Sequence, residues 1–367
     1  MLALCVPGAS IYALCKAGDD AVAALLAAAS AEALGVSEAQ VRAAGSVDGA
    51  RSAVKCGSSF PVCVSVNEMF GFVSPAADCA DVLAAGDLVK VELGVHVDGY
   101  PAIVGETRVV GEPAGDAAHI EALAAVSNAV YIAAHCIMRM LRPGVKNSDI
   151  TYLIGHVAAH FGVKTIKNLL SYEVKRYVSD GRNQIQMSPP NPGDEAPESG
   201  VFEIMSGQAF CIDVRMSSGS GLVKQGSAST QVFKRRVDQF TQLRTDMGVK
   251  AYRDVNQHFP TFHFAVRQLK EQLTAKAGVR QMLEHHMVEP FETLRDKSKR
   301  ALIACARFTA MVLDQRTVVT TPIPLPLLDG IALPLGVPEL LARDAEAHEA
   351  FSPMSVLPKP VENMAED

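Results

Sequence analysis

The segment that most constrains the fold spans residues 86–107 and reads GDLVKVELGVHVDGYPAIVGET. Val89, Val91 and Leu93 alternate with polar or small residues, which predicts a strand with one face against a core. The dipeptide Asp98-Gly99 is typical of a tight turn between two antiparallel strands, and a second apolar run follows it. The segment therefore predicts a β-hairpin that carries one carboxylate, Glu92, in the middle of its first strand.

A second segment repeats this arrangement. Residues 207–233 read GQAFCIDVRMSSGSGLVKQGSASTQVF, and Gly207 precedes Asp213 by six residues, just as Gly86 precedes Glu92. Both carboxylates lie in apolar strands that run into turns. Two similar halves that each offer one carboxylate to a common centre predict a pseudo-symmetric α/β fold.

Residues 86–99, GDLVKVELGVHVDG, resemble the first metal-ligand strand of the type 2 methionine aminopeptidases. They resemble more closely the non-peptidase relatives of those enzymes, the proliferation-associated (ErbB-binding) protein family. Shorter similar stretches are Val66-Asn67, Asp213–Gly219, Phe233-Lys234-Arg235, Glu289-Pro290-Phe291 and Arg307-Phe308-Thr309. The resemblance extends from about residue 10 to about residue 320. It implies the pita-bread fold, an α/β (α+β) architecture of two pseudo-symmetric halves around a central antiparallel sheet.

The resemblance also predicts the domain organisation. Residues 1–340 would form the pita-bread domain, with an inserted helical subdomain at about 238–295. Apolar patterning predicts that residues 243–287 are mostly helical, with breaks at Phe259-Pro260 and Gly278. Residues 341–367 have the composition of an acidic, flexible tail.

The family's five metal ligands can be carried over one at a time. The first Asp corresponds to Glu92 and the second to Ile103, which cannot ligate. The His falls at Ser171 or Tyr172, with a one-residue ambiguity. The first Glu corresponds to Asp213, and the second to Arg307, whose guanidinium has no lone pair to offer.

Two carboxylates beside an arginine should not hold two divalent cations. We expect instead an internal ion pair in which Arg307 replaces the metal charge that Glu92 and Asp213 once neutralised, because buried carboxylates need a compensating cation. The sequence therefore predicts a chain that is not an enzyme and has no metal, cofactor or small-molecule substrate. A residual metalloaminopeptidase is the alternative that metal analysis would test.

Two other motifs have the spacing of a ligand site but lack residues that such a site needs. His156 and His160 are four residues apart, as in a zinc helix, but Val157 stands where the general base would be, so a helix flank is the preferred interpretation. Residues 217–221, SSGSG, follow a strand but lack a Gly-Lys-Ser/Thr ending, so a turn is preferred to a phosphate site.

Composition describes a globular chain of 367 residues with 49% hydrophobic residues. No apolar run stands out as long enough to span a bilayer, and the N-terminus lacks the basic start of a signal peptide. Eight cysteines are scattered without a CxxC motif and are expected to be free thiols in a reducing compartment. A cytoplasmic location follows, with a nuclear or nucleolar pool as a further expectation, and no membrane partner is expected.

The net charge of −6 argues against nucleic-acid binding, but its distribution is uneven. Residues 234–280 contain ten Lys or Arg and four Asp or Glu, whereas residues 341–367 contain two basic and six acidic residues. The resemblance implies a ribosome-associated or ribosome-biogenesis factor that binds the large subunit, through rRNA and ribosomal proteins near the tunnel exit. The RNA-binding candidates are Lys175, Arg176, Arg182, Lys234, Arg235, Lys250, Arg253, Arg267 and Lys270. The alternative is a protein–protein adaptor that holds a peptide in the metal-free cleft.

Overall fold

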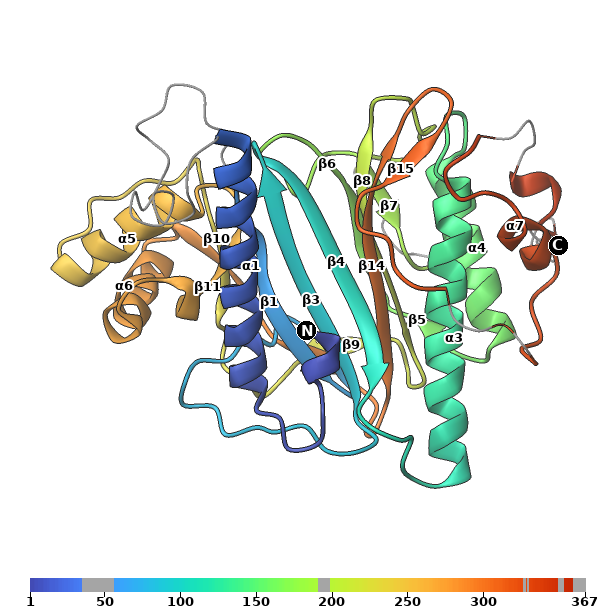
Figure 1. The fold of residues 1–367 in the computed structure, drawn as a ribbon, viewed down its shortest axis with the longest axis horizontal. Coiled ribbons are helices and arrows are strands. Elements are labelled where there is room, and N and C mark those ends of the chain that lie inside the picture. Colours follow the sequence, from blue (N-terminus) through green and yellow to red (C-terminus); the bar gives the residue numbers. More distant parts are fainter. Residues whose placement is uncertain (35–55, 191–198, 326–327, 329, 349–352, 359–367) are drawn as a thin grey trace, which may run out of the picture.

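A large antiparallel sheet organises the computed structural model, which describes residues 1–34, 56–190, 199–325, 328, 330–348 and 353–358 (Figure 1). In the described residues its main strand order is β1-β3-β4-β14-β8-β6-β7, with β15 beside β14 and β5 beside β8. The strands are β1 (Cys56–Val66), β3 (Leu88–Val97), β4 (Tyr100–Val109), β5 (Lys164–Thr165), β6 (Leu170–Val174), β7 (Gln184–Gln186), β8 (Ala209–Ser217), β14 (Ile303–Val312) and β15 (Thr317–Val319). This is the predicted α/β architecture of two halves around an antiparallel sheet.

The two halves meet where β4 pairs with β14. The predicted hairpin is present, and its register places Glu92 opposite Gly105. On the other side of Gly105 lies Arg307, which in turn pairs with Asp213 of β8. A Cβ at Gly105 would lie 2.9 Å from the Cβ of Arg307 and 3.1 Å from the Cγ of Glu92, so the close approach of these side chains requires glycine there. The sheet register thus brings both carboxylate strands to one point.

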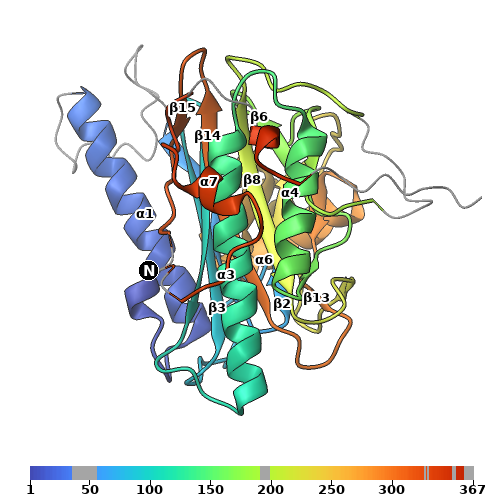
Figure 2. The ribbon, with the colours of Figure 1, turned by 90° about the vertical axis from the view of Figure 1, so that its right-hand side faces the viewer.

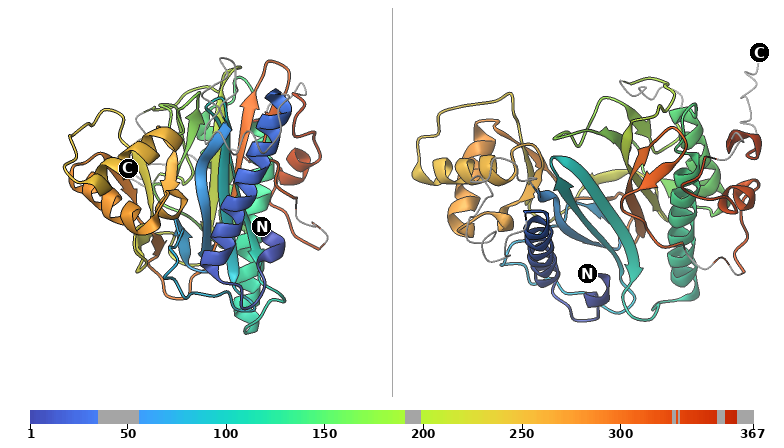
Figure 3. Two further views of the ribbon diagram at one scale, coloured as in Figure 1. Left: turned by 60° about the vertical axis from the view of Figure 1, so that its left-hand side comes forward. Right: turned by 45° about the horizontal axis from the view of Figure 1, so that its top comes forward.

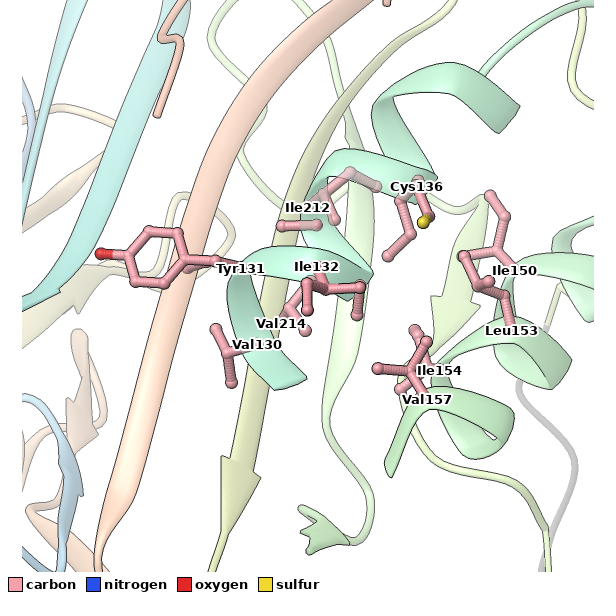
Figure 4. Packing of buried hydrophobic residues seen from close by; sticks show 14 of the residues in the cluster. Val130, Tyr131, Ile132, Cys136, Ile150, Leu153, Ile154, Val157, Ile212 and Val214 are labelled. Atoms are coloured by element: carbon pink, nitrogen blue, oxygen red, sulfur yellow. The ribbon is translucent and has the colours of Figure 1, made fainter. Parts of the chain in front are cut away.

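Helices cover one face of each half. The helix α1 (Ile11–Leu34) packs on β1. The helix α3 (Ala117–Met140) covers β14 and β8, and α4 (Asn147–His160) packs beside α3 on β7 and β5 (Figure 2). Figure 4 shows Ile132 of α3 beside Ile212 and Val214 of β8, with Ile154 of α4 in the same apolar cluster. These apolar contacts fix β8 from one face, so its alternate residues point to the other face.

The helix α3 is long and apolar enough to span a membrane, which the sequence reading did not single out. It has 24 residues, and 61% of its most apolar window is buried inside the fold. Its N-cap is Asp116, whose side chain accepts a hydrogen bond from the backbone of His119. Burial on this scale identifies α3 as the core helix of a globular protein.

The inserted part forms a separate lobe at one side of the sheet (Figure 3). It contains α5 (Asp246–His258), α6 (Gln272–Glu284), the 3-10 turn η2 (Val266–Gln268) and a small sheet, β11-β10-β12, built from His263–Ala265, Val232–Arg235 and Val288–Phe291. Phe259 ends α5, near the predicted break. The prediction that Gly278 breaks the helix was wrong: Gly278 lies inside α6, where a Cβ would lie 2.5 Å from Ala251 of α5. Glycine there lets the two helices pack closely.

The remaining elements are short. The strands β2 (Met69–Gly71), β13 (Leu294–Asp296) and β9 (Val223–Gln225) form a third sheet, and η1 (Leu2–Leu4), α7 (Val337–Leu341) and η3 (Pro353–Ser355) complete the described chain. Part of the stretch predicted as a tail, residues 341–348 and 353–358, lies against the body of the fold. Leu357 is buried there, and the backbone of Thr317 donates a hydrogen bond to Glu346. Residues 349–352 and 359–367 lie outside the described residues.

Candidate functional site

Charged side chains from three strands meet in the middle of the large sheet. The face of β8 opposite Ile212 and Val214 presents Asp213 and Arg215, because strand residues alternate between faces. Glu92 comes from β3 and Arg307 from β14. All four residues are buried or nearly so, although charged side chains are seldom found in a core.

The predicted ion pair is present. Nη1 of Arg307 lies 3.3 Å from Oε1 of Glu92, and its Nε lies 3.9 Å from Oδ2 of Asp213. The same Nε donates a hydrogen bond to Sγ of Cys211 at 3.3 Å, and the guanidinium carbon lies 4.7 Å from the ring centre of Phe60. Arg307 thus contacts both carboxylates and stacks on an aromatic ring.

A second guanidinium, which the sequence reading missed, makes the closer contacts. Nε of Arg215 donates to Oδ1 of Asp213 at 2.8 Å, and its Nη2 donates to Oδ2 of Asp213 at 3.0 Å and to Oε1 of Glu92. Its Nη1 donates to the backbone oxygen of Phe70, and its guanidinium carbon lies 4.5 Å from the centre of the Phe70 ring. The signal was available, since a residue two positions after Asp213 in a strand must share its face.

These contacts set the ionisation of the cluster. Burial would raise the pKa of the Asp213 carboxyl, but the charges of Arg215 and Arg307 outweigh burial and hold that pKa below its usual value. Burial would also lower the pKa of both arginines, yet nearby groups, including the Asp213 and Glu92 carboxylates, raise the pKa of each above its usual value. Two carboxylates therefore face two guanidiniums, and the cluster is electrically balanced.

Lys90 lies two residues before Glu92 on the same face of β3 and is fully buried. Its Nζ donates a hydrogen bond to the backbone oxygen of Asn67 at 2.6 Å. Burial, and then the nearby charge of Arg215, lower the pKa of Lys90 to about 7. Above that pH the amine is mostly neutral and leaves the charge balance of the four-residue cluster intact.

The other positions that the resemblance assigns to the metal site offer no ligand. Ile103 is buried opposite Gly94. Ser171 accepts a hydrogen bond at its Oγ from the backbone of Asp213 at 2.9 Å, and the half-buried Tyr172 pairs with Cys211. Across the described ranges, no three His, Cys, Asp or Glu side chains come together as a metal site would need. The dinuclear metal centre that the fold implies does not fit these residues, because two guanidiniums fill the space between the carboxylates.

Comparison with known proteins decides the family. Residues 10–223 match the sequence model of Metallopeptidase family M24. The chain belongs to metallopeptidase family M24. Among its M24 relatives, the ERBB-3 binding protein 1 of Solanum tuberosum is 29% identical over 314 residues, which cover 85% of this chain and 74% of that protein. The Proliferation-associated protein A of Dictyostelium discoideum is 27% identical over 95% of this chain and 87% of its own length.

Enzymes of the family are also similar, over less of this chain. The methionine aminopeptidase of Methanothermobacter thermautotrophicus is 27% identical over 72% of this chain and 83% of its own length. Among solved structures, that of a thermophilic Arx1 has a TM-score of 0.74, with 22% identity, and covers 94% of this chain and 93% of that one. The resemblance to the proliferation-associated proteins and the pita-bread M24 fold are both confirmed.

The nine basic candidates for RNA binding lie on different elements of the fold and differ in exposure. Lys175, Arg176 and Arg182 are exposed around β6 and β7, where Arg176 pairs with Asp98 at 2.7 Å and Lys175 with Glu173 at 3.3 Å. The half-buried Lys234 and Arg235 lie on β10, and Lys234 pairs with Asp180 at 2.6 Å. Lys250, Arg253 and Lys270 are exposed on the helical subdomain.

Arg267 is different from the other candidates because it is buried. Its Nε pairs with Oδ2 of Asp19 at 2.7 Å, and its Nη2 donates to the backbone oxygen of Val62 at 2.7 Å. Arg267 therefore ties the subdomain to α1 and β1, and it is not available to contact a partner.

The two motifs with ligand-like spacing have other partners. Nε2 of His156 lies 3.1 Å from the backbone oxygen of Leu335, and Nε2 of His160 lies 2.9 Å from that of Ala332. The loop of residues 217–221 wraps the carboxylate of Asp296, which accepts hydrogen bonds from Ser217, Ser220 and the backbone of Gly221. A loop filled by a carboxylate would repel a phosphate.

Proposed function

We propose that this M24 chain is catalytically inactive and acts as a ribosome-associated or ribosome-biogenesis factor. It binds the large ribosomal subunit through rRNA and ribosomal proteins near the tunnel exit. The observation that supports the first part is the buried cluster of Glu92, Asp213, Arg215 and Arg307, which includes three of the positions that the resemblance assigns to metal ligands.

Metal-dependent peptide hydrolysis needs a Lewis acid and an activated water at the site. The cluster offers neither, because both carboxylate oxygens of Asp213 and Oε1 of Glu92 already accept hydrogen bonds from guanidinium nitrogens. A metal ion would have to displace two arginines that are held by hydrogen bonds, ring stacking and burial. The function would then depend on binding of a partner at the protein surface.

Nucleic-acid binding is supported by the basic residues of the subdomain and by the relatives. Lys250 and Arg253 are three residues apart on α5, so they lie on neighbouring positions of one helix face. Side chains of this kind contact phosphates and provide affinity without reading bases. One relative, 29% identical over 80% of this chain, is the Curved DNA-binding protein of Schizosaccharomyces pombe. The resemblance to the proliferation-associated proteins supports the choice of the large ribosomal subunit as the partner.

The test is sedimentation of the tagged protein from a lysate on sucrose gradients, at low salt and at about 0.5 M salt, where exposed charges are screened. We expect co-migration with the large subunit that is lost at high salt. The variant Lys250→Glu/Arg253→Glu should move the protein to the top of the gradient. A matched variant, Lys297→Glu/Lys299→Glu, changes two exposed lysines outside the subdomain and should still co-migrate.

One outcome would refute the ribosome proposal, and another would refute only its phosphate contacts. Migration at the top of the gradient at both salt concentrations would exclude stable subunit binding. Co-migration that resists 0.5 M salt and the Lys250→Glu/Arg253→Glu change would exclude phosphate contacts by α5, and would favour an apolar protein contact of the adaptor kind.

A further inference from the structure

One aromatic ring of the helical subdomain is left open to solvent. The basic stretch of residues 234–280 contains five aromatic residues. Three of them are buried phenylalanines, Phe259, Phe262 and Phe264. Tyr252 of α5 is half-buried against the core of the subdomain, whereas Phe240 is 74% exposed. Phe240 lies in the loop of residues 236–245, which leads from β10 into α5 at the outer edge of the lobe (Figure 3).

The exposed ring stands on a fixed support. Phe240 meets Tyr252 edge-on, with the ring centres 6.0 Å apart and the ring planes at 61°. The guanidinium carbon of Arg235 lies 5.7 Å from the centre of the Tyr252 ring, and its Nη1 donates a hydrogen bond to the backbone oxygen of Pro260 at 3.1 Å. Tyr252 is thus held between the core and Arg235. A ring that is positioned in advance binds a planar partner at a small cost in entropy.

Arginines without ion-pair partners flank the ring. Arg236 and Arg244 are each four residues from Phe240 in the same loop, and Arg253 is the residue after its supporting tyrosine. All three are exposed, and none has an ion-pair partner in the part of the chain that the structure describes. The loop contains one carboxylate, that of Asp238. Free guanidiniums around an open aromatic ring favour an anionic partner that also has a flat face.

An unpaired nucleotide has both properties. Its base can stack on an aromatic side chain, and its phosphates can contact neighbouring arginines. A base-paired helix offers the phosphates but not the base face, because its bases are stacked on one another. An acidic peptide would pair with the arginines but would leave the ring without a planar partner. The combination therefore favours a single-stranded region of RNA.

We propose that an unpaired nucleotide of an RNA loop or bulge stacks on Phe240, with Tyr252 as the support behind the ring. Arg236, Arg244 and Arg253 contact the phosphates on either side. This inference rests on the proposed function and extends it, because it adds to the phosphate contacts of the subdomain one contact that depends on a base.

Binding of the purified full chain to two labelled strands tests the stacking contact. One strand is an oligouridylate of about ten nucleotides, a length typical of single-strand sites. The other is an abasic strand of the same length and charge. Fluorescence anisotropy should show about tenfold tighter binding of the oligouridylate, which corresponds to about 1.4 kcal/mol and lies within the range for one base on an aromatic side chain. Phe240→Ala should abolish this preference by weakening the oligouridylate alone.

Tryptophan variants give an independent readout, because the protein contains no tryptophan. Phe240→Trp keeps an aromatic platform, and its indole fluorescence should be quenched by the oligouridylate but not by the abasic strand. The matched variant Leu273→Trp places an indole at a 90% exposed position of α6 and should show no quenching by either strand. Leu273→Ala removes exposed apolar surface from the same subdomain and should leave the preference for the oligouridylate unchanged.

The proposal is overturned if the native protein binds both strands equally well, or if Phe240→Ala still prefers the oligouridylate. Neither result would contradict the phosphate contacts of Lys250 and Arg253, which the sucrose gradients test separately. Failure of both strands to bind would also overturn the proposal and would favour an apolar protein partner at Phe240.

Discussion

The substitution Arg215→Met tests whether the buried guanidiniums hold the fold together. Met keeps most of the side-chain volume but removes the positive charge. Glu92, which is 1% exposed, and Asp213 are then left with Arg307 as the one guanidinium of the cluster. Removing one partner of a buried ion pair costs about 3–5 kcal/mol, because the remaining charge stays desolvated. We expect the free energy of unfolding at neutral pH to fall by about this amount, measured by urea denaturation.

The pH dependence of the free energy of unfolding tests the same prediction in a second way. In the native protein the pKa of Asp213 is lowered below its usual 3.8. Its contribution to stability is therefore fully present above that value and is lost as the pH falls through the folded-state pKa. Without Arg215, burial should raise the pKa of Asp213 instead, so the folded variant takes up a proton that the unfolded chain lacks. The stability of Arg215→Met should then decrease as the pH rises from the usual pKa of about 3.8 through the raised folded-state pKa of Asp213.

Two companion variants separate charge from packing. Asp213→Asn/Arg215→Met removes one buried charge of each sign. It should recover most of the lost stability, because the remaining carboxylate of Glu92 is still paired with Arg307. Arg280→Met breaks the exposed pair with Glu284, whose side chains are 81% and 62% exposed, and should cost no more than about 0.5 kcal/mol. The reasoning would be refuted if the Arg215→Met variant were as stable as the native protein at neutral pH and showed no loss of stability as the pH rises.

Three further changes follow from the same contacts. Arg307→Leu should destabilise less than Arg215→Met in the same urea experiment, because Arg307 is 14% exposed and lies 3.3 and 3.9 Å from the carboxylates; an equal or larger loss would contradict the ranking. Since the pKa of Lys90 is lowered to about 7, the unfolded chain binds a proton that the folded chain lacks between about pH 7 and 10.5, so native stability should rise with pH there. Lys90→Met should flatten that rise, and an unchanged slope would show that Lys90 titrates normally. Asp296→Asn should lower the thermal midpoint by weakening the loop of residues 217–221, whose donors surround the carboxylate; an unchanged midpoint would mean that the loop does not depend on this charge.

Much of the site could be predicted from the sequence because a β-hairpin fixes its own register. The turn at Asp98-Gly99 and the alternating apolar residues place Glu92 in the middle of a strand, and the repeated spacing does the same for Asp213. The resemblance added Arg307. Arg215 and Lys90 were missed although both lie two residues from a predicted carboxylate on the same strand face. The alternation rule would have placed them in the site.

Other features depend on contacts between distant residues that no local pattern encodes. His156 and His160 have the spacing of a ligand pair, and only the folded chain brings the oxygens of Leu335 and Ala332 to them. Arg267 belongs to a basic stretch by sequence, but the fold buries it against Asp19 of α1. Gly278 has the sequence signature of a helix break, and the close approach of α5 gives it another role.

The central claim is that two arginines occupy the position that metal ions hold in peptidases of this fold. The most direct test is an anomalous difference map from crystals soaked in a millimolar Mn²⁺ solution. The account predicts no peak among Glu92, Asp213, Arg215 and Arg307, with both guanidiniums still bound to the carboxylates. A Mn²⁺ peak bridging Glu92 and Asp213, with the arginines displaced, would contradict it and would restore a metallopeptidase as the working interpretation.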